Sequence, residues 1–203
     1  MTKVILASAS PARLQLLKSA GIFAEVKVSG INEELPEFLN LPPIQMVVAL
    51  AKAKALAVAS SLKGDQLVIG ADSTLEFEGK KVGKPATSDE ALSLWSSYRN
   101  KSGVLYTGQV LIDLSNGAMA ERVSATKITF ANVSDEEIDA YIKTGEPLQV
   151  AGGATLDGIG SAFISRIEGD ATGVIGLSMP HLFEMVTSLG HSWHKLRQIG
   201  SAI

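Results

Sequence analysis

The residues best suited to chemistry lie in one short stretch of the chain. Residues 66–69 form a run of apolar and β-branched side chains, which is typical of a buried strand, and Gly70-Ala71 follows it. We expect Asp72 to emerge at the end of this strand. Glu78-Gly79 then favours a tight turn, which would carry the returning chain to Lys84.

Asp72 and Lys84 therefore share one hairpin, and each side chain has a chemistry of its own. An ionised carboxylate can hold a divalent metal or take a proton from water. A lysine can neutralise a phosphate as a point charge. These residues by themselves leave a second interpretation open, in which Asp72 only caps a turn and Lys84 is a solvated surface residue.

A second candidate site lies near the start of the chain. Residues 4–7 are apolar and predict a strand, after which Ser10 is a good helix N-cap and Pro11 fits the first helical position. The unpaired N–H groups at such a helix start attract anions. Arg13 lies in the first turn, where the helix dipole disfavours a cation, so its position indicates a bound anion. We expect Gly21 to end this helix.

An acidic loop adds further candidates. Residues 24–28 predict a second strand, and Glu33 and Glu34 follow Asn32 in the loop between this strand and the next expected helix. If this loop folds toward Asp72, one of the carboxylates could share a metal with it. The alternative is that the acidic loop is only a solvated face.

The helix that Pro42-Pro43 opens is expected to run to about Ser60 and to place one lysine in a cleft. Lys52 and Lys54 flank its apolar stripe on opposite edges, at about 80° to either side, so only one of them faces a given cleft. Periodicity does not say which. The stripe consists of Ile44, Val47, Val48, Ala51, Ala55 and Val58.

The rest of the chain predicts helices and long strands. Ser88 caps an expected helix, and Ser102-Gly103 favours a turn. Two long strand-like runs, 104–114 and 118–130, flank Ser115-Asn116-Gly117, which is a strong hairpin signal. We therefore expect an antiparallel part of the sheet in this region.

No further catalytic motif stands out toward the C-terminus. Ser134 begins an expected helix with a capping box. Residues 152–160 are rich in glycine but match neither a P-loop nor a Rossmann fingerprint. Pro180 opens the last expected helix, and His191 and His194 are interpreted as surface or packing residues.

Composition restricts the function classes. The chain has 203 residues, 46% hydrophobic and 19% charged, and we expect residues 1–203 to form a single domain. It has no cysteine, which excludes disulfides, thiolate metal sites and cysteine nucleophiles. A net charge of −3 argues against binding to long nucleic acid, which needs a basic face. No signal peptide or membrane-spanning stretch is found, so we expect a cytoplasmic protein without membrane contact.

Several short motifs, in order along almost the whole chain, resemble those of the Maf proteins. These are nucleoside triphosphate pyrophosphatases related in fold to the inosine triphosphate pyrophosphatases. The resemblance implies a mixed α/β fold in which a long bent sheet, with helices outside it, floors a central cleft between two lobes. The motifs occupy residues 6–13, 50–55, 70–73, 83–85, 107–108, 144–147, 151–152, 167–170 and 174–177.

The resemblance also implies an activity and a role for each candidate residue. A nucleoside triphosphate is hydrolysed between its α- and β-phosphates to the monophosphate and pyrophosphate, which clears non-canonical or excess nucleotides. The cofactor is a divalent cation, Mg²⁺ or Mn²⁺. Asp72 matches the proton acceptor for the attacking water, and Glu33 joins it on the metal. Lys54 fits the family's helix lysine better than Lys52. The polyphosphate-binding positions are Ser8, Arg13, Lys54 and Lys84.

Three positions depart from the family pattern and leave the nucleobase open. Ala12 stands where a second arginine is common, Ser73 follows the catalytic aspartate, and Asp157 stands where the family branches carry glutamine or glutamate. These positions are expected to shape specificity, so a 7-methyl-GTP- or inosine-type triphosphate pyrophosphatase is one alternative. A non-catalytic nucleotide-binding regulator of cell division is the other. Besides the nucleotide, a second copy of the chain is an expected partner, as a homodimer.

Overall fold

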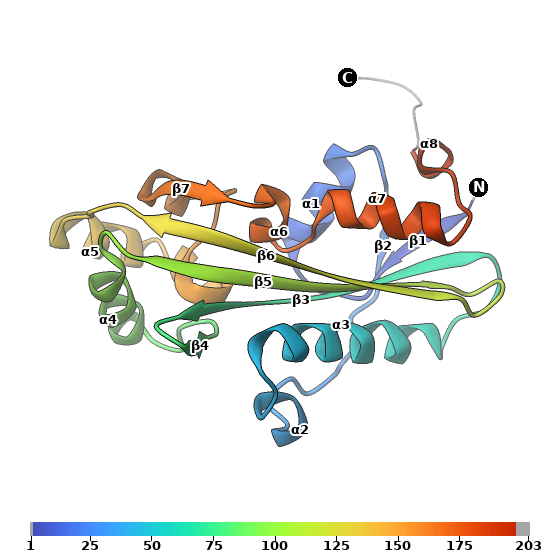
Figure 1. Cartoon of the computed structure of the whole chain (residues 1–203), viewed down its shortest axis with the longest axis horizontal. Coiled ribbons are helices and arrows are strands. Elements are labelled where there is room, and N and C mark those ends of the chain that lie inside the picture. The colour runs from blue at the N-terminus through green and yellow to red at the C-terminus, as the bar shows by residue number, and fades with distance from the viewer. Residues whose placement is uncertain (1, 198–203) are drawn as a thin grey trace.

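A single mixed sheet runs the length of the molecule (Figure 1). The computed structural model describes residues 2–197, and the ends of the expected 1–203 domain, residue 1 and residues 198–203, lie outside this part. The strand order is β2-β1-β3-β5-β6-β7, with β4 paired to β3. β1 pairs parallel with β2 and β3, and the other pairs are antiparallel. The strands are β1 (Lys3–Leu6), β2 (Glu25–Val26), β3 (Gln66–Phe77), β4 (Lys80–Val82), β5 (Ser102–Asp113), β6 (Met119–Phe130) and β7 (Ile164–Glu168).

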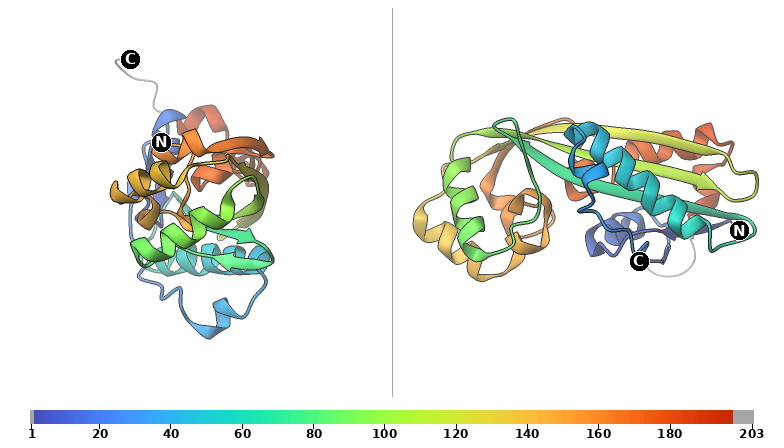
Figure 2. Two further views of the ribbon diagram at one scale, coloured as in Figure 1. Left: turned by 90° about the vertical axis from the view of Figure 1, so that its left-hand side faces the viewer. Right: turned by 90° about the horizontal axis from the view of Figure 1, so that it is seen from below.

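Helices cover both faces of this sheet and one of its ends. α3 lies along one face, α1, α6 and α7 lie on the other side, and α4 and α5 gather at one end (Figures 1 and 2). The helices are α1 (Pro11–Ser19), α2 (Pro36–Leu39), α3 (Pro43–Ala59), α4 (Ser88–Tyr98), α5 (Asp135–Lys143), α6 (Ala171–Ile175), α7 (Met179–Ser188) and α8 (Trp193–Leu196), with short 3₁₀ turns η1 (Glu146–Gln149), η2 (Ala151–Gly153) and η3 (Ile159–Phe163). The mixed α/β fold with flanking helices is thus confirmed.

Alternating side chains of the central strands divide one half of the core between two faces. In β1, Val4 and Leu6 pack into the cluster formed with α1 and α7. Ile5 and Ala7 point to the opposite face and pack against α3. The two-residue period of a strand produces this division, and burial on both faces explains why the sequence shows a continuous apolar run here.

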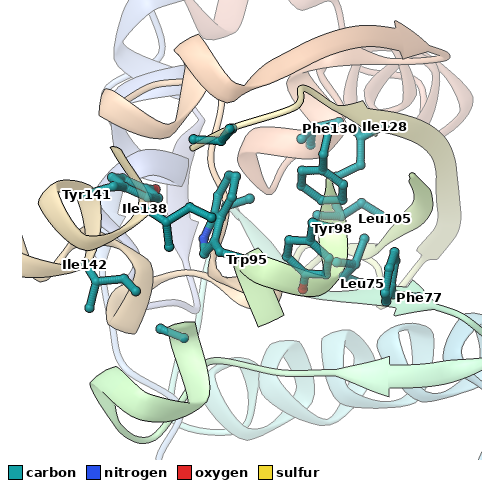
Figure 3. Close-up of a cluster of buried hydrophobic side chains, with 14 residues drawn as sticks. Leu75, Phe77, Trp95, Tyr98, Leu105, Ile128, Phe130, Ile138, Tyr141 and Ile142 are labelled. Carbon is teal, nitrogen blue, oxygen red and sulfur yellow. The ribbon is translucent and has the colours of Figure 1, made fainter. Parts of the chain in front are cut away.

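The other half of the molecule has an aromatic core between the far ends of the long strands and α4 and α5 (Figure 3). Trp95 lies at its centre, with ring centroids 5.3 Å from Tyr141 and 5.6 Å from Phe130, both edge-to-face. Tyr98 stacks on Phe130 at 4.2 Å. The expected two lobes therefore correspond to separate cores at the two ends of β3 and β5.

Capping residues in the sequence predicted where two of the helices begin. The hydroxyls of Ser10 and Ser134 cap α1 and α5 as predicted, by accepting from the backbone N–H groups of Arg13 and Glu137. The expected cap of α4 was wrong by one residue, since Thr87 caps it. α6 was not expected, because its five residues are too few to show a helical period.

Three further expectations were wrong where pairing or packing overrides the local pattern. Ser102-Gly103 does not form a turn but begins β5, because both residues pair with β6. The strand expected at 24–28 is only two residues long. In α3, Ile44 is exposed, while Met46 and Leu50 are buried under the loop that precedes the helix.

Two glycines allow α3 to lie directly on β3 and β5. A Cβ on Gly70 would be 2.2 Å from the carbonyl oxygen of Ala51, and one on Gly108 would be 2.5 Å from that of Val47. Such contacts are far inside van der Waals distance, so any side chain here would push the helix away. The close approach brings the middle of α3 against the middle of β3.

Replacement of one of these glycines tests this packing. We expect Gly70→Ala to lower the free energy of unfolding by about 1–3 kcal/mol, because the methyl group overpacks the helix–sheet contact. Gly83→Ala is the matched control, since a Cβ there meets no atom within 4 Å. Urea denaturation of both variants measures the difference. Equal stability of Gly70→Ala and the parent protein would show that the helix does not rest on this glycine.

Candidate active site

One cleft of about 1060 Å³ collects most of the candidate residues. Its walls come from the β1–α1 turn, the loop before α2, the inner side of α3, the middle of β3, the segment after β4 and residues 149–155. Asp157 is not among the lining residues. The candidates that line the cleft are Ser8, Ala12, Arg13, Glu33, Lys54, Asp72, Ser73 and Lys84.

Asp72 lies in the middle of a strand rather than at its end. The expected strand end was wrong, because β3 continues to Phe77 and pairs with β5 on both sides of the Asp72–Gly108 position. Ala71 packs toward α1 and α7, so alternation turns Asp72 toward α3. The carboxylate is therefore carried by a rigid paired strand and is buried.

The ammonium group of Lys54 bridges two carboxylates. Its Nζ lies 2.7 Å from Oδ1 of Asp72 and 2.6 Å from Oε1 of Glu33. Lys54 is only 6% exposed, so this ion cluster lies at the inner end of the cleft. The acidic loop thus folds toward Asp72.

The structure also decides between the two lysines of α3. Lys52 points away from the cleft and pairs with Glu121 on β6, with Nζ and Oε1 2.6 Å apart. Lys54 faces the cleft, as the resemblance implied. The choice depends on how α3 is rotated on the sheet, which the contacts at Gly70 and Gly108 fix.

Burial sets the proton affinity of Asp72. It raises the pKa of the carboxyl above the ordinary value of 3.8, while the charges of Lys54 and Arg13 oppose this rise and the charge of Glu33 adds to it. A carboxylate with a raised pKa is a better proton acceptor than a solvated one. The surroundings of Asp72 are therefore suited to a general base.

Arg13 is buried and bound to three neutral oxygens. Its Nε donates to the carbonyl of Gly176 at 2.7 Å, Nη1 to the hydroxyl of Ser8 at 3.0 Å and Nη2 to that of Ser73 at 3.1 Å. These bonds use three of the five N–H groups of a guanidinium. Burial lowers the pKa of Arg13, and the charges of Asp72 and Glu33 counteract this effect. Arg13 thus ties α1 to β3 and to the turn after α6.

Sequence reasoning missed the part that Thr107 plays behind this arginine. Thr107 is fully buried and donates to the carbonyl of Gly173 at 2.7 Å, so the hydroxyl of Ser73, 2.8 Å away, donates to Thr107. Ser73 can then accept from Arg13. The register Ser73–Thr107 between β3 and β5 creates this chain, and only the pairing reveals it.

Asp157 does not line the cleft but is hydrogen-bonded to Thr155, which does. The hydroxyl of Thr155 donates to the carboxylate of Asp157, and Thr155 lines the cleft. Lys84 also lines the cleft and is exposed, in the segment after β4. The carbonyl of Gly83 beside it accepts from the backbone N–H of Gly152 at 2.8 Å.

Glu33 and Asp72 are the residues that could hold a divalent cation. Each uses one carboxylate oxygen on Lys54, so the second oxygen of each is not part of that contact. Among residues 2–197, no group of three or more His, Cys, Asp or Glu side chains is arranged to hold a metal. Two carboxylates completed by phosphate oxygens and water fit the usual binding of Mg²⁺.

The histidines do not contribute to the cleft. His191 lies 2.8 Å from the buried carboxylate of Asp113, with the distance measured from its Nε2 to Oδ2. This contact joins the region after α7 to the β5–β6 hairpin. It agrees with the predicted packing role.

The charges around Asp72 predict opposite shifts in two variants. In protein free of nucleotide and metal, we expect the pKa of Asp72 to lie above 3.8, to rise further in Lys54→Met and to fall in Glu33→Gln. NMR titration of the Asp72 carboxyl carbon measures these shifts. Glu121→Gln, which removes the partner of Lys52, is the control and leaves the pKa unchanged. A pKa at or below 3.8 in the parent protein would contradict the effect of burial.

Comparison with known proteins finds relatives over more than nine-tenths of the chain. Proteins named nucleoside triphosphate pyrophosphatase occur in Salinispora tropica, with 47% identity over 191 residues, and in Streptomyces coelicolor, with 44% over 190. These alignments cover 92% and 93% of this chain and 84% and 91% of the relatives. A protein of the same name from Cyanothece sp. is 45% identical over 192 residues, which is 95% of this chain and 97% of the relative.

A solved structure is a more distant match. It is described as a nucleoside-triphosphatase, dITP/XTP pyrophosphatase, from Mycobacterium abscessus, and the alignment covers 98% of this chain and 100% of that one. At 15% identity and a TM-score of 0.40, this likeness carries no argument about the chemistry. The family model described as Maf-like protein, in contrast, matches residues 3–189, and the chain therefore belongs to the Maf family.

Proposed function

We propose that this protein hydrolyses nucleoside triphosphates between the α- and β-phosphates, releasing the monophosphate and pyrophosphate. The observation that carries the proposal is the Glu33–Lys54–Asp72 cluster, in which Lys54 and Asp72 are buried, in the same cleft as Arg13 and Lys84. A base, a pair of carboxylates and several cations are thereby available to one substrate. The activity named for the Salinispora and Streptomyces relatives supports the proposal.

Local positive charge is what lets an acidic protein take such a substrate. A nucleoside triphosphate carries about four negative charges, whereas the chain itself has a net charge of −3. Lys54, Lys84 and Arg13 line the cleft together with the start of α1, where N–H groups and the helix dipole favour an anion. We assign the polyphosphate to this side of the cleft, with the hydroxyl of Ser8 as a further contact.

In the proposed reaction, Asp72 accepts a proton from the attacking water. The water oxygen forms a bond to the α-phosphorus, the bond from this phosphorus to the bridging oxygen breaks, and pyrophosphate leaves with the electron pair. Lys54 keeps the carboxylate of Asp72 in place and favours its ionised form. No covalent intermediate is needed, because positioned charges stabilise the transition state of phosphoryl transfer.

Glu33 and Asp72 are the residues that we assign to a divalent cation, Mg²⁺ or Mn²⁺. When bound, such a cation neutralises phosphate charge and makes a bound water more acidic. Lys54 would then share its two carboxylates with this second positive charge. The exposed position of Glu33 on a loop suits a ligand that completes the site together with substrate.

We further propose that the walls near Ala12, Ser73 and Thr155 select the nucleobase. Ser73 is held by Arg13 and Thr107, so its geometry is fixed. Asp157 would act on the base only through the hydroxyl of Thr155. Relative rates on dTTP, UTP, CTP, GTP, ITP and 7-methyl-GTP would identify the preferred base.

Asp72→Asn tests the proposed base. We expect kcat for pyrophosphate release to fall by about 10²–10⁴, because the amide cannot take a proton. In the parent protein, activity is present above the raised pKa of Asp72 and is lost as the pH falls through it. Glu121→Gln controls for the loss of a carboxylate that binds a lysine of α3. Turnover by Asp72→Asn within a few-fold of the parent rate would refute the assignment.

Lys84→Ala tests the proposed contact with the triphosphate. We expect kcat/KM to fall about tenfold or more, because a cation near the phosphates is removed. Lys80→Ala is the matched control, since Lys80 lies on the same hairpin but is not among the cleft-lining residues. Steady-state kinetics on one nucleotide measure both variants. Equal kinetics for Lys84→Ala and the parent protein would exclude Lys84 from the site.

A further inference from the structure

Two of the polar side-chain tips in the aromatic core of the α4–α5 lobe, those of Trp95 and Tyr98, bind the same wall of the cleft. The indole N–H of Trp95 donates to the carbonyl of Gly153, and the hydroxyl of Tyr98 donates to the carbonyl of Gly152, each at 2.9 Å. Both side chains come from α4 and lie side by side in the cluster (Figure 3). They are almost completely buried, so these two bonds are shielded from water.

The turn that they hold has a backbone shape that favours glycine. Gly152 and Gly153 have φ values of +70° and +65°, in the left-handed region. The residues on either side, Ala151 and Ala154, line the cleft. The turn is therefore a stiff part of the cleft wall whose carbonyls are fixed from behind by α4.

The same turn supports the segment that carries Lys84. The backbone N–H of Gly152 donates to the carbonyl of Gly83 at 2.8 Å. A Cβ on Gly153 would lie 3.2 Å from Cγ of Pro85, so the two segments are also in close contact there. The carbonyl of Gly83 and the ring of Pro85, on the two sides of Lys84, thus both contact the turn.

The position of Lys84 depends on this support. Lysine is a flexible side chain with four rotatable carbons, and Lys84 itself is exposed. Where its ammonium can reach is therefore set by the backbone at residues 83–85. A misplacement of about 1 Å at a catalytic contact is enough to lower a rate markedly.

We infer that Tyr98, assisted by Trp95, is a positioning residue for Lys84: it holds the Gly152–Gly153 turn against residues 83–85 and thereby fixes the ammonium over the cleft. This inference rests on the proposed function, because it gives Lys84 a task in triphosphate hydrolysis. Burial raises the pKa of the Tyr98 hydroxyl well above its usual range, so the group keeps its proton and remains a donor.

Tyr98→Phe removes the hydroxyl and keeps the ring that stacks on Phe130. The matched control is Tyr141→Phe, which makes the same change in the same aromatic cluster. The hydroxyl of Tyr141 donates to Glu146, whose carboxylate also accepts from the N–H groups of residues 159 and 160, and none of these residues lines the cleft. A general loss of stability in the lobe should therefore appear in both variants.

The first measurement is a double-mutant cycle with Lys84→Ala. We expect Tyr98→Phe to lower kcat/KM about 3- to 10-fold, as the loss of a buried hydrogen bond allows, and Tyr141→Phe to leave it nearly unchanged. In the Tyr98→Phe background, Lys84→Ala should cost at least about threefold less than in the parent protein, because the two residues act through one contact. Additive effects of Tyr98→Phe and Lys84→Ala would overturn the inference.

The second measurement needs no activity. Hydrogen exchange at the Gly152 amide should accelerate at least about tenfold in Tyr98→Phe and not in Tyr141→Phe, because only the former frees the turn from residue 83. Equal exchange in the two variants would overturn the inference. If the parent protein released no pyrophosphate, the proposed function would fail, whereas the exchange result would still report whether Tyr98 holds the turn.

Discussion

The contact of the Lys54 ammonium with two carboxylates is the constraint around which the site is built. Burying charges in this way costs solvation energy, which the attraction between them offsets only when their geometry is close. The geometry is close because Gly70 and Gly108 let α3 rest on the strands beside Asp72. A helix, a strand and a loop that are distant in sequence therefore converge on a single nitrogen atom.

A second network holds Arg13 in the cleft with neutral groups. Arg13 is held by Ser8, Ser73 and the carbonyl of Gly176, and Ser73 is oriented in turn by Thr107. These neutral oxygens accept hydrogen bonds from the guanidinium without neutralising it, so its charge remains available to an anion. Carboxylates thus surround the ammonium of Lys54, whereas two hydroxyls and a backbone carbonyl surround the guanidinium of Arg13.

Much of this arrangement could be read from the sequence, and the remainder has a physical reason. The caps at Ser10 and Ser134 depend on residues within one turn, which a sequence shows directly. The sequence predicts an end of β3 that is too early, because Gly70 looks like a strand terminator. In the structure, the lack of a side chain at Gly70 instead allows α3 to pack closely on the strand. The link from Ser73 to Thr107 follows from strand register, which no local pattern contains. Candidate residues were therefore predictable individually, but their partners across the sheet were not.

The length of β3 and β5 has a consequence for how a nucleotide enters and leaves. Each strand passes from one hydrophobic core into the other without interruption; in β3, Ala71 belongs to the first and Leu75 to the second. No hinge peptide joins the lobes along these strands, so the two halves cannot swing apart like the jaws of a periplasmic binding protein. Access to the cleft therefore depends on the segments at its rim, among them the loop that bears the exposed side chain of Glu33.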